Sequence, residues 1–287
     1  MTTFQLYRGD AAQVLRGMAA NSVDSVVCDP PYGISFMNKH WDYDIPSVET
    51  WREVFRVLKP GGHVLSFAGT RTQHRMVAAI EDAGFEIQDM IAWVYATGMP
   101  KHQSRLKPAL EPITVARKPA PKATLLNIDA CRIAVKDEVI NVPQSDPTKR
   151  SGVVGSNLGI SNSDTEKFQA AQRASVEKTM TLGRYPANLI HDGSDDVVAL
   201  FPDSDGAGKS LPRVKITGYG DGAVGKGKSE YFGGERIPFE SGSGSAARFF
   251  YCTKASKKDR GEGNNHVTVK PTDLMRYLCR LVTPPNG

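Results

Sequence analysis

The sequence predicts an α/β fold with a mostly parallel central sheet. In the first third of the chain, short apolar strands alternate with amphipathic helices, capping residues precede the helices, and glycines or prolines separate the elements. Alternation of this kind is typical of strands joined by crossover helices. A chain of 287 residues is long enough for one large α/β domain or for a core domain with a smaller insert.

Composition and charge exclude several classes of protein. Hydrophobic residues make up 40% of the chain and charged residues 23%, which is ordinary for a globular protein and disfavours disorder. No apolar run approaches the roughly 20 residues that span a bilayer, and the first residues lack a signal-peptide pattern, so we expect a cytoplasmic protein without a membrane partner. The net charge of +5 is compatible with a polyanionic partner but does not establish one.

The cysteines are far apart in the sequence, at Cys28, Cys131, Cys252 and Cys279. Because the sequence has no CxxC pair or Cys/His cluster, their spacing predicts neither a zinc site nor a disulfide framework. We therefore expect reduced thiols and no metal cofactor.

Caps and apolar spacing place the elements of the first third. They are a short helix after Asp10 reaching Met18, a strand at Val23–Cys28, a helix after Ser47 with apolar positions Val48, Trp51, Phe55 and Leu58 and a stop at Pro60-Gly61-Gly62, a strand at His63–Phe67, a helix from Arg71 to Ala83, and strand material at Phe85–Ile87 and Met90–Tyr95. This regular pattern ends near Met99-Pro100.

The middle of the chain has a different composition, rich in Gly, Ser, Lys and Asp. Regular elements resume with a strand candidate at Arg248–Cys252 and a final helix that Thr272 caps, with apolar positions at Leu274, Leu278 and Leu281. We expect a first part of the core at 1–117, a loop-rich insert at 118–246, and a return to the core at 247–287.

The segment Asp29-Pro30-Pro31-Tyr32 follows the strand Val23–Cys28 directly. Two prolines cannot continue a central strand, so the segment forms a turn at the carboxyl end of that strand, where open α/β sheets bind ligands. The Asp29 carboxylate and the Pro30 carbonyl offer acceptors that can hold an amine with its lone pair aimed at an electrophile. On its own, the segment is also compatible with an ordinary strand-ending turn.

The order of several segments resembles the β group of amino-methylating DNA methyltransferases. These segments are Leu6-Tyr7-Arg8-Gly9-Asp10, the Asp29-Pro30-Pro31-Tyr32 turn, Val57–Val64, and His266-Val267-Thr268-Val269-Lys270-Pro271. The resemblance implies a Rossmann-like methyltransferase fold that uses S-adenosyl-L-methionine, with target recognition in the insert. It also implies methyl transfer to N6 of an adenine flipped out of double-stranded DNA.

The same resemblance implies roles for individual residues. Asp29 and the Pro30 carbonyl would orient the amine on the stiff turn that Pro31 completes, and Tyr32 would stack on the base. The cofactor would be held by Asp10, Asp29, Thr268 and Lys270. A helix cap is the alternative for Asp10, and a solvated side chain is the alternative for Lys270. Methylation of cytosine N4 is the alternative activity, which the family more often associates with serine in place of Asp29, and a homodimer is left open.

The chain departs from the family pattern at two places. Val267 stands where the family has a proline. The sequence also ends at Thr283-Pro284-Pro285-Asn286-Gly287, before the F-x-G-x-G loop with which the family cradles the methionine part of its cofactor. We expect either a truncated chain or an incomplete cofactor site, and in the second case a DNA-binding protein without activity.

Other features have competing interpretations. Gly222–Ser229 matches the phosphate-loop pattern of ATPases, but the paired glycines Gly233-Gly234 disfavour the helix that such a loop needs, so we favour a glycine-lysine loop. Trp41 is expected in the core, with a base pocket as the alternative. Phosphate contact and simple solvation are equally compatible with the basic residues Lys101, His102, Arg105 and Lys107.

Overall fold

The structure, a computed structural model, describes residues 4–98, 106–121, 124–135, 170–171, 174–175, 177–204, 244–253, 259, 261–262 and 269–285. The chain divides into two compact units. The first comprises 1–134, 182–201 and 247–287, and the second comprises 135–181 and 202–246. In the second unit, β6 (Asp203–Ser204) pairs antiparallel with β7 (Gly244–Ser245).

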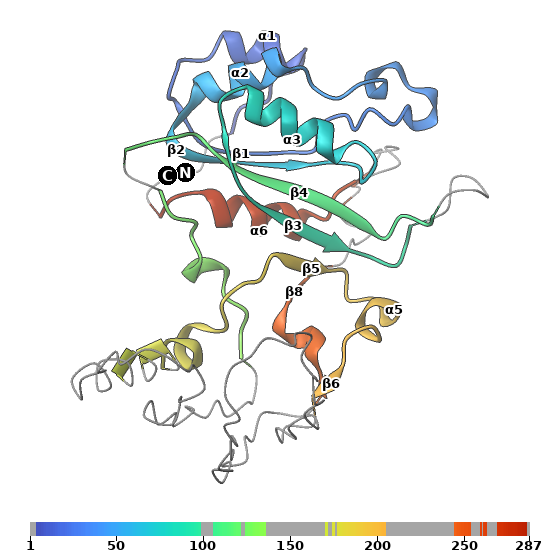
Figure 1. Cartoon of the computed structure of the whole chain (residues 1–287), viewed down its shortest axis with the longest axis vertical. Coiled ribbons are helices and arrows are strands. Elements are labelled where there is room, and N and C mark those ends of the chain that lie inside the picture. The colour runs from blue at the N-terminus through green and yellow to red at the C-terminus, as the bar shows by residue number, and fades with distance from the viewer. Residues whose placement is uncertain are drawn as a thin grey trace, which may run out of the picture. The chain divides into compact units, whose positions relative to one another are not determined.

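The described strands of the first unit form a central sheet of six strands in the order β1-β2-β4-β3-β5-β8 (Figure 1). Their bounds are β1 Val23–Cys28, β2 Leu58–Phe67, β3 Glu86–Val94, β4 Leu110–Arg117, β5 Leu189–His191 and β8 Tyr251–Cys252. β4 lies between β2 and β3 and runs antiparallel to both, whereas the other pairs are parallel. The predicted α/β class with a mostly parallel sheet is confirmed.

Helices cover both faces of this sheet (Figure 1). Among the described residues, the named helices are α1 Ala11–Arg16, α2 Val48–Val57, α3 Gln73–Asp82, α5 Asp195–Val198 and α6 Thr272–Val282, with short 3-10 turns at Phe36–Asn38, His40–Asp42, Asp129–Cys131 and Ala246–Phe249. α1, α2 and α3 lie on one side and α6 on the other. Val64 of β2 belongs to the core under α2 and α3, and its neighbour Leu65 belongs to the core under α6. Because both faces are buried, β2 has a nearly continuous apolar run instead of an alternating one.

The predicted helix caps are confirmed at the two N-terminal helices. Asp10 accepts a hydrogen bond from the backbone N–H of Gln13 at 3.0 Å, and Ser47 accepts one from Thr50 at 3.3 Å. At α6 the prediction was wrong, because Thr272 is the first helical residue and donates its own backbone N–H to the Asp259 carboxylate at 2.8 Å. The cap of α6 therefore comes from a residue distant in sequence.

The junction between α2 and β2 lies earlier in the chain than predicted. The sequence analysis placed the end of the helix at Pro60-Gly61-Gly62. The helix ends at Val57, and Leu58 already belongs to the strand. Lys118 Nζ donates hydrogen bonds to the carbonyls of Phe55 and Leu58, each at 2.8 Å, and so satisfies acceptors at the end of the helix. Burial lowers the pKa of this ammonium. A side chain at Gly62 would place its Cβ 2.8 Å from the Asp24 carbonyl, so the close approach of β1 and β2 requires glycine there.

The antiparallel strand β4 was not predicted, because the regular pattern was expected to end near Met99-Pro100. Pro112, which normally argues against a central strand, lies within it. The Pro112 carbonyl accepts a hydrogen bond from Ala68 N at 3.0 Å, and Ala68 lies just beyond the last residue of β2. The N–H that proline lacks is therefore missing at a point where the hydrogen-bonded pairing with β2 has already ended. The predicted strand at Arg248–Cys252 is shorter than expected, since only Tyr251–Cys252 is extended and a 3-10 turn precedes it.

The cysteines have the predicted reduced form. All four are free thiols, of which Cys131 is buried. Burial raises the pKa of Cys28 to about 12, so this thiol is a structural group and not a nucleophile at neutral pH. In the part of the chain that the structure describes, no helix is long and apolar enough to cross a membrane.

Replacing Leu278 with alanine tests the packing of α6. Leu278 is fully buried in the core between α6 and the sheet, so Leu278→Ala should lower the free energy of unfolding by about 2–5 kcal/mol. Arg276→Ala on the same helix removes an exposed side chain and is the control. Urea denaturation measures both, and equal midpoints for the two variants would contradict this packing.

The buried His63 should make stability depend on pH. Burial, helped by the nearby Arg117, lowers the pKa of His63 from 6.5 to about 4. Between these two values the unfolded chain binds the extra proton, so stability is lost as pH falls from about 6.5 to 4, by on the order of 3 kcal/mol. Urea titrations across this range should show a shallower loss for His63→Gln, whereas His74→Gln, at an exposed position of α3, should behave as the wild type. Parallel curves for the wild type and His63→Gln would exclude this contribution.

Candidate active site

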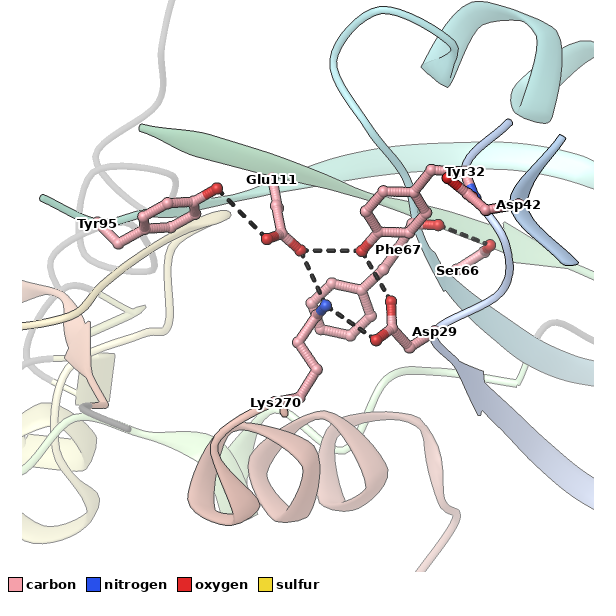
Figure 2. A network of polar contacts seen from close by, with 8 residues as sticks. All are labelled: Asp29, Tyr32, Asp42, Ser66, Phe67, Tyr95, Glu111 and Lys270. Atoms are coloured by element: carbon pink, nitrogen blue, oxygen red, sulfur yellow. Dashed lines mark hydrogen bonds and ion pairs between the residues drawn. The ribbon is translucent and has the colours of Figure 1, made fainter. Parts of the chain in front are cut away.

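Five segments meet at one edge of the central sheet. The turn Asp29-Pro30-Pro31-Tyr32 follows β1, Phe67 ends β2, and Tyr95 follows β3. Glu111 lies near the start of β4, opposite Trp93 of β3. Because β4 is antiparallel to its neighbours, its beginning lies at the edge where the parallel strands end. Lys270, just before α6, completes the cluster (Figure 2).

The Lys270 ammonium lies at the centre of this cluster. Its Nζ is 2.9 Å from Oδ2 of Asp29 and 3.1 Å from Oε2 of Glu111. It also lies 5.5 Å from the ring centroid of Tyr32 and 4.9 Å from that of Phe67. The side chain is only 10% exposed, so the charge depends on these carboxylates and aromatic faces in place of water. The alternative of a solvated Lys270 is therefore wrong.

The Tyr32 hydroxyl connects the same two carboxylates. It contacts Oδ1 of Asp29 at 2.7 Å and Oε2 of Glu111 at 2.9 Å (Figure 2). Burial, followed by the charges of Glu111 and Asp29, raises the pKa of Tyr32 far above its usual value. The phenol therefore remains a hydrogen-bond donor at any working pH.

Glu111 is the member of the site that the sequence analysis missed. Its Oε1 accepts a hydrogen bond from the Tyr95 hydroxyl at 3.3 Å, while its Oε2 faces Tyr32 and Lys270. Burial and the charge of Glu111 raise the pKa of Tyr95. The run Ile113-Thr114-Val115-Ala116 was an available signal for this buried strand, which begins at Leu110, but it does not indicate a role for Glu111.

Asp42 fixes the backbone that follows the turn, and the sequence analysis missed it as well. This carboxylate is only 2% exposed. It accepts hydrogen bonds from four backbone N–H groups that are close together in the sequence, those of Tyr32, Gly33, Ile34 and Phe36, at 2.6 to 3.3 Å. On the other side, Thr72 donates its hydroxyl to the carbonyl of Tyr32 at 2.5 Å. The position of Tyr32 is thus held through its main chain from two directions.

The structure brings together only some of the site residues predicted from the sequence. Asp29, Tyr32 and Lys270 are in contact, and Pro30 and Pro31 are half-buried in the turn between Asp29 and Tyr32.

Asp10 caps α1, and Thr268 lies outside the described residues. Among the described residues, no group of three or more His, Cys, Asp and Glu side chains is arranged to hold a metal ion.

The competing features have separate outcomes. Trp41 is 53% exposed, so its expected place in the core was wrong. Trp41 directly precedes Asp42, whose carboxylate is buried because it accepts hydrogen bonds from the backbone N–H groups around it. With the Asp42 side chain pointing inward, the Trp41 side chain points outward. Lys107 is exposed. The other basic residues, Lys101, His102 and Arg105, and the loop Gly222–Ser229 lie outside the described residues.

Comparison with known proteins decides the family. The profile of the N6_N4_Mtase family, described as DNA methylase, matches residues 23–287. The chain belongs to this DNA methylase family. The chain is 28% identical over 133 residues to the Type II methyltransferase M.HindIII of Haemophilus influenzae, a match that covers 31% of this chain and 42% of the relative. It is 28% identical over 143 residues to the Type II methyltransferase M.HpaI of Haemophilus parainfluenzae, covering 46% of this chain and 44% of that protein.

The matched part of the chain spans less than half the length of either relative. Among solved structures, the M1.HpyAVI–SAM complex is 19% identical, with a TM-score of 0.34 and coverage of 66% of this chain and 82% of that one.

Removing the charge of Asp42 should destabilise the loop around the turn. Asp42→Asn replaces one acceptor oxygen with an amide NH₂ that faces backbone N–H groups, so we expect a loss of about 2–3 kcal/mol in the free energy of unfolding. Asp44→Asn is the matched control, because that carboxylate is 70% exposed and pairs with Arg75 at the surface. Urea unfolding of the two variants makes the comparison, and a loss below 1 kcal/mol for Asp42→Asn would refute the role.

Proposed function

We propose that the protein transfers a methyl group from S-adenosyl-L-methionine to N6 of adenine in double-stranded DNA, with the base flipped out of the helix. One observation carries the proposal: the Asp29 carboxylate lies at the carboxyl edge of the sheet, on a proline-stiffened turn, between the Tyr32 hydroxyl and the Lys270 ammonium. Membership of a DNA methylase family supports it.

The arrangement of acceptors suits the chemistry of an exocyclic amine. The lone pair of such an amine is delocalised into the ring, so the nitrogen is a poor nucleophile until its N–H groups are held by acceptors. The Asp29 carboxylate would accept one N–H and the Pro30 carbonyl the other, which aims the lone pair at the methyl carbon. The N–C bond would form as the C–S bond of the donor breaks, and the amine would then lose one proton, which the Asp29 carboxylate holding its N–H would accept. The flat ring of Tyr32 would stack on the base.

The charges of the site fit a cationic methyl donor. Two carboxylates, Asp29 and Glu111, surround one ammonium, Lys270, which leaves one formal negative charge. A sulfonium is attracted by such a charge and by the aromatic faces of Tyr32 and Phe67 nearby. S-adenosyl-L-methionine supplies the methyl group when it is bound. Asp10 and Thr268 are proposed to hold the rest of this cofactor, and target recognition is proposed for 118–246.

Cytosine N4 is the competing acceptor, because its amine presents the same problem of a delocalised lone pair. The residue at position 29 favours adenine, since the resemblance associates serine at this position more often with cytosine. A DNA-binding protein without transferase activity is the remaining alternative, and it predicts DNA binding with no methylated product.

Nucleoside analysis of mixed-sequence DNA incubated with the full-length protein and cofactor tests the proposal. We expect N6-methyladenine from the wild type. Because a preorganised transition-state contact is lost, Asp29→Asn should lower the rate of transfer by about 10²–10³-fold with DNA affinity retained. Asp24→Asn, which removes a carboxylate of β1 that pairs with Lys59 of β2, should leave the rate unchanged. N4-methylcytosine without N6-methyladenine would overturn the assignment of the base, and equal rates for Asp29→Asn and wild type would overturn the role of Asp29.

A further inference from the structure

Two donors of the site, the Tyr32 hydroxyl and the Lys270 ammonium, lie between the same two carboxylates. The Tyr32 hydroxyl is 2.7 Å from Asp29 and 2.9 Å from Glu111. The Lys270 ammonium is 2.9 Å from Asp29 and 3.1 Å from Glu111. In both cases the two acceptors differ by only 0.2 Å, the difference between the paired distances. Small movements of the donors therefore exchange one acceptor for the other.

The Tyr32 hydroxyl has a single proton, so it can donate to only one of the carboxylates at a time. The neighbouring acidic groups and burial keep that proton on the phenol, as the raised pKa of Tyr32 shows. The other carboxylate then faces the phenol oxygen without a proton between them, and the Lys270 ammonium compensates this repulsion by contacting both. The cluster thus has two arrangements of its hydrogen bonds that use the same atoms.

The two carboxylates are not equivalent. The side chain of Asp29 is 31% exposed and that of Glu111 is 19% exposed. Tyr95 donates a further hydrogen bond to Glu111, and Glu111 is carried by a strand inside the sheet, whereas Asp29 lies on a turn. Asp29 is therefore the carboxylate that is more accessible to a substrate, and Glu111 is the one held more firmly. Figure 2 shows the two carboxylates on either side of the Lys270 ammonium.

From this geometry we infer that Glu111 is a positioning residue for methyl transfer. It accepts the hydrogen bonds of the Tyr32 hydroxyl and the Lys270 ammonium when Asp29 binds the amine of the target base. The inference rests on the proposed function, because it assigns Asp29 to that amine. In the arrangement of the structure, both oxygens of Asp29 already accept a donor, Oδ1 from Tyr32 and Oδ2 from Lys270. A carboxylate that is neutralised by an ammonium is a weaker acceptor for an amine. Transfer of both donors to Glu111 restores the full charge of Asp29 at the moment the amine needs it.

Charge removal at Glu111 separates this role from a structural one. In Glu111→Gln the ammonium has Asp29 as its only anionic partner in the cluster and should remain there. We expect the single-turnover rate of transfer by the full-length protein at saturating DNA and cofactor to fall about 10–100-fold. The dissociation constant for DNA should change less than 3-fold, because Glu111 does not touch the substrate. Glu86→Gln, at the opposite end of β3, is the control and should keep the wild-type rate.

A double variant provides the readout that a structural role would not produce. Adding Lys270→Met to Glu111→Gln removes the ammonium that contacts Asp29, so the double variant should react faster than Glu111→Gln alone. A double-mutant cycle measures this coupling between the two positions. If Glu111 only supports the fold, a second change in the same cluster should slow the reaction further. Urea unfolding midpoints establish that each variant is folded under the assay conditions.

The outcomes distinguish this inference from the proposed function. A wild-type rate for Glu111→Gln, or a double variant slower than Glu111→Gln, overturns the inference. If Asp29→Asn is slow in the same experiments, the proposed function remains in place. An Asp29→Asn variant as fast as the wild type, or a wild-type protein that transfers no methyl group, overturns the proposed function and the inference with it. A slow Glu111→Gln that Lys270→Met accelerates supports both.

Discussion

The Lys270 ammonium is the charge around which the site is arranged. A cation with a side chain only 10% exposed has little water to solvate it, so it requires acceptors from the protein. Those acceptors come from separate parts of the chain: Asp29 from the turn after β1, Glu111 from β4, and the ring faces of Tyr32 and Phe67. The position of α6, the order of the strands and the shape of the turn must all agree for this one charge to be compensated.

The antiparallel strand β4 makes this agreement possible. In a sheet with only parallel strands, the start of each strand lies at the edge opposite the ligand site. β4 runs the other way between β2 and β3, so its first residues lie beside the ends of its neighbours, with Glu111 opposite Trp93. A glutamate can thus enter the site from the rigid interior of the sheet, where its position is less free than on a loop.

The parts of the fold and site that depend on local signals could be predicted from the sequence. The strand Val23–Cys28, the caps Asp10 and Ser47, and the turn with Asp29 are each specified by a few neighbouring residues. Glu111 and Asp42 could not be found in this way, because an isolated glutamate or aspartate has no local pattern. Their roles come from contacts with Lys270 and with main-chain N–H groups, which exist only once the strands are in register.

The site combines a fixed main chain with exchangeable hydrogen bonds. Asp42 and Thr72 hold the backbone of Tyr32 from two sides, so the main chain that carries its ring is fixed before any ligand binds. The hydroxyl at the end of that ring and the ammonium of Lys270 each have two acceptors at nearly equal distance. Groups that position a reacting atom must not move, whereas protons that respond to its charge must move at little cost. Separating the two tasks between backbone and side chains allows one short turn to meet both requirements.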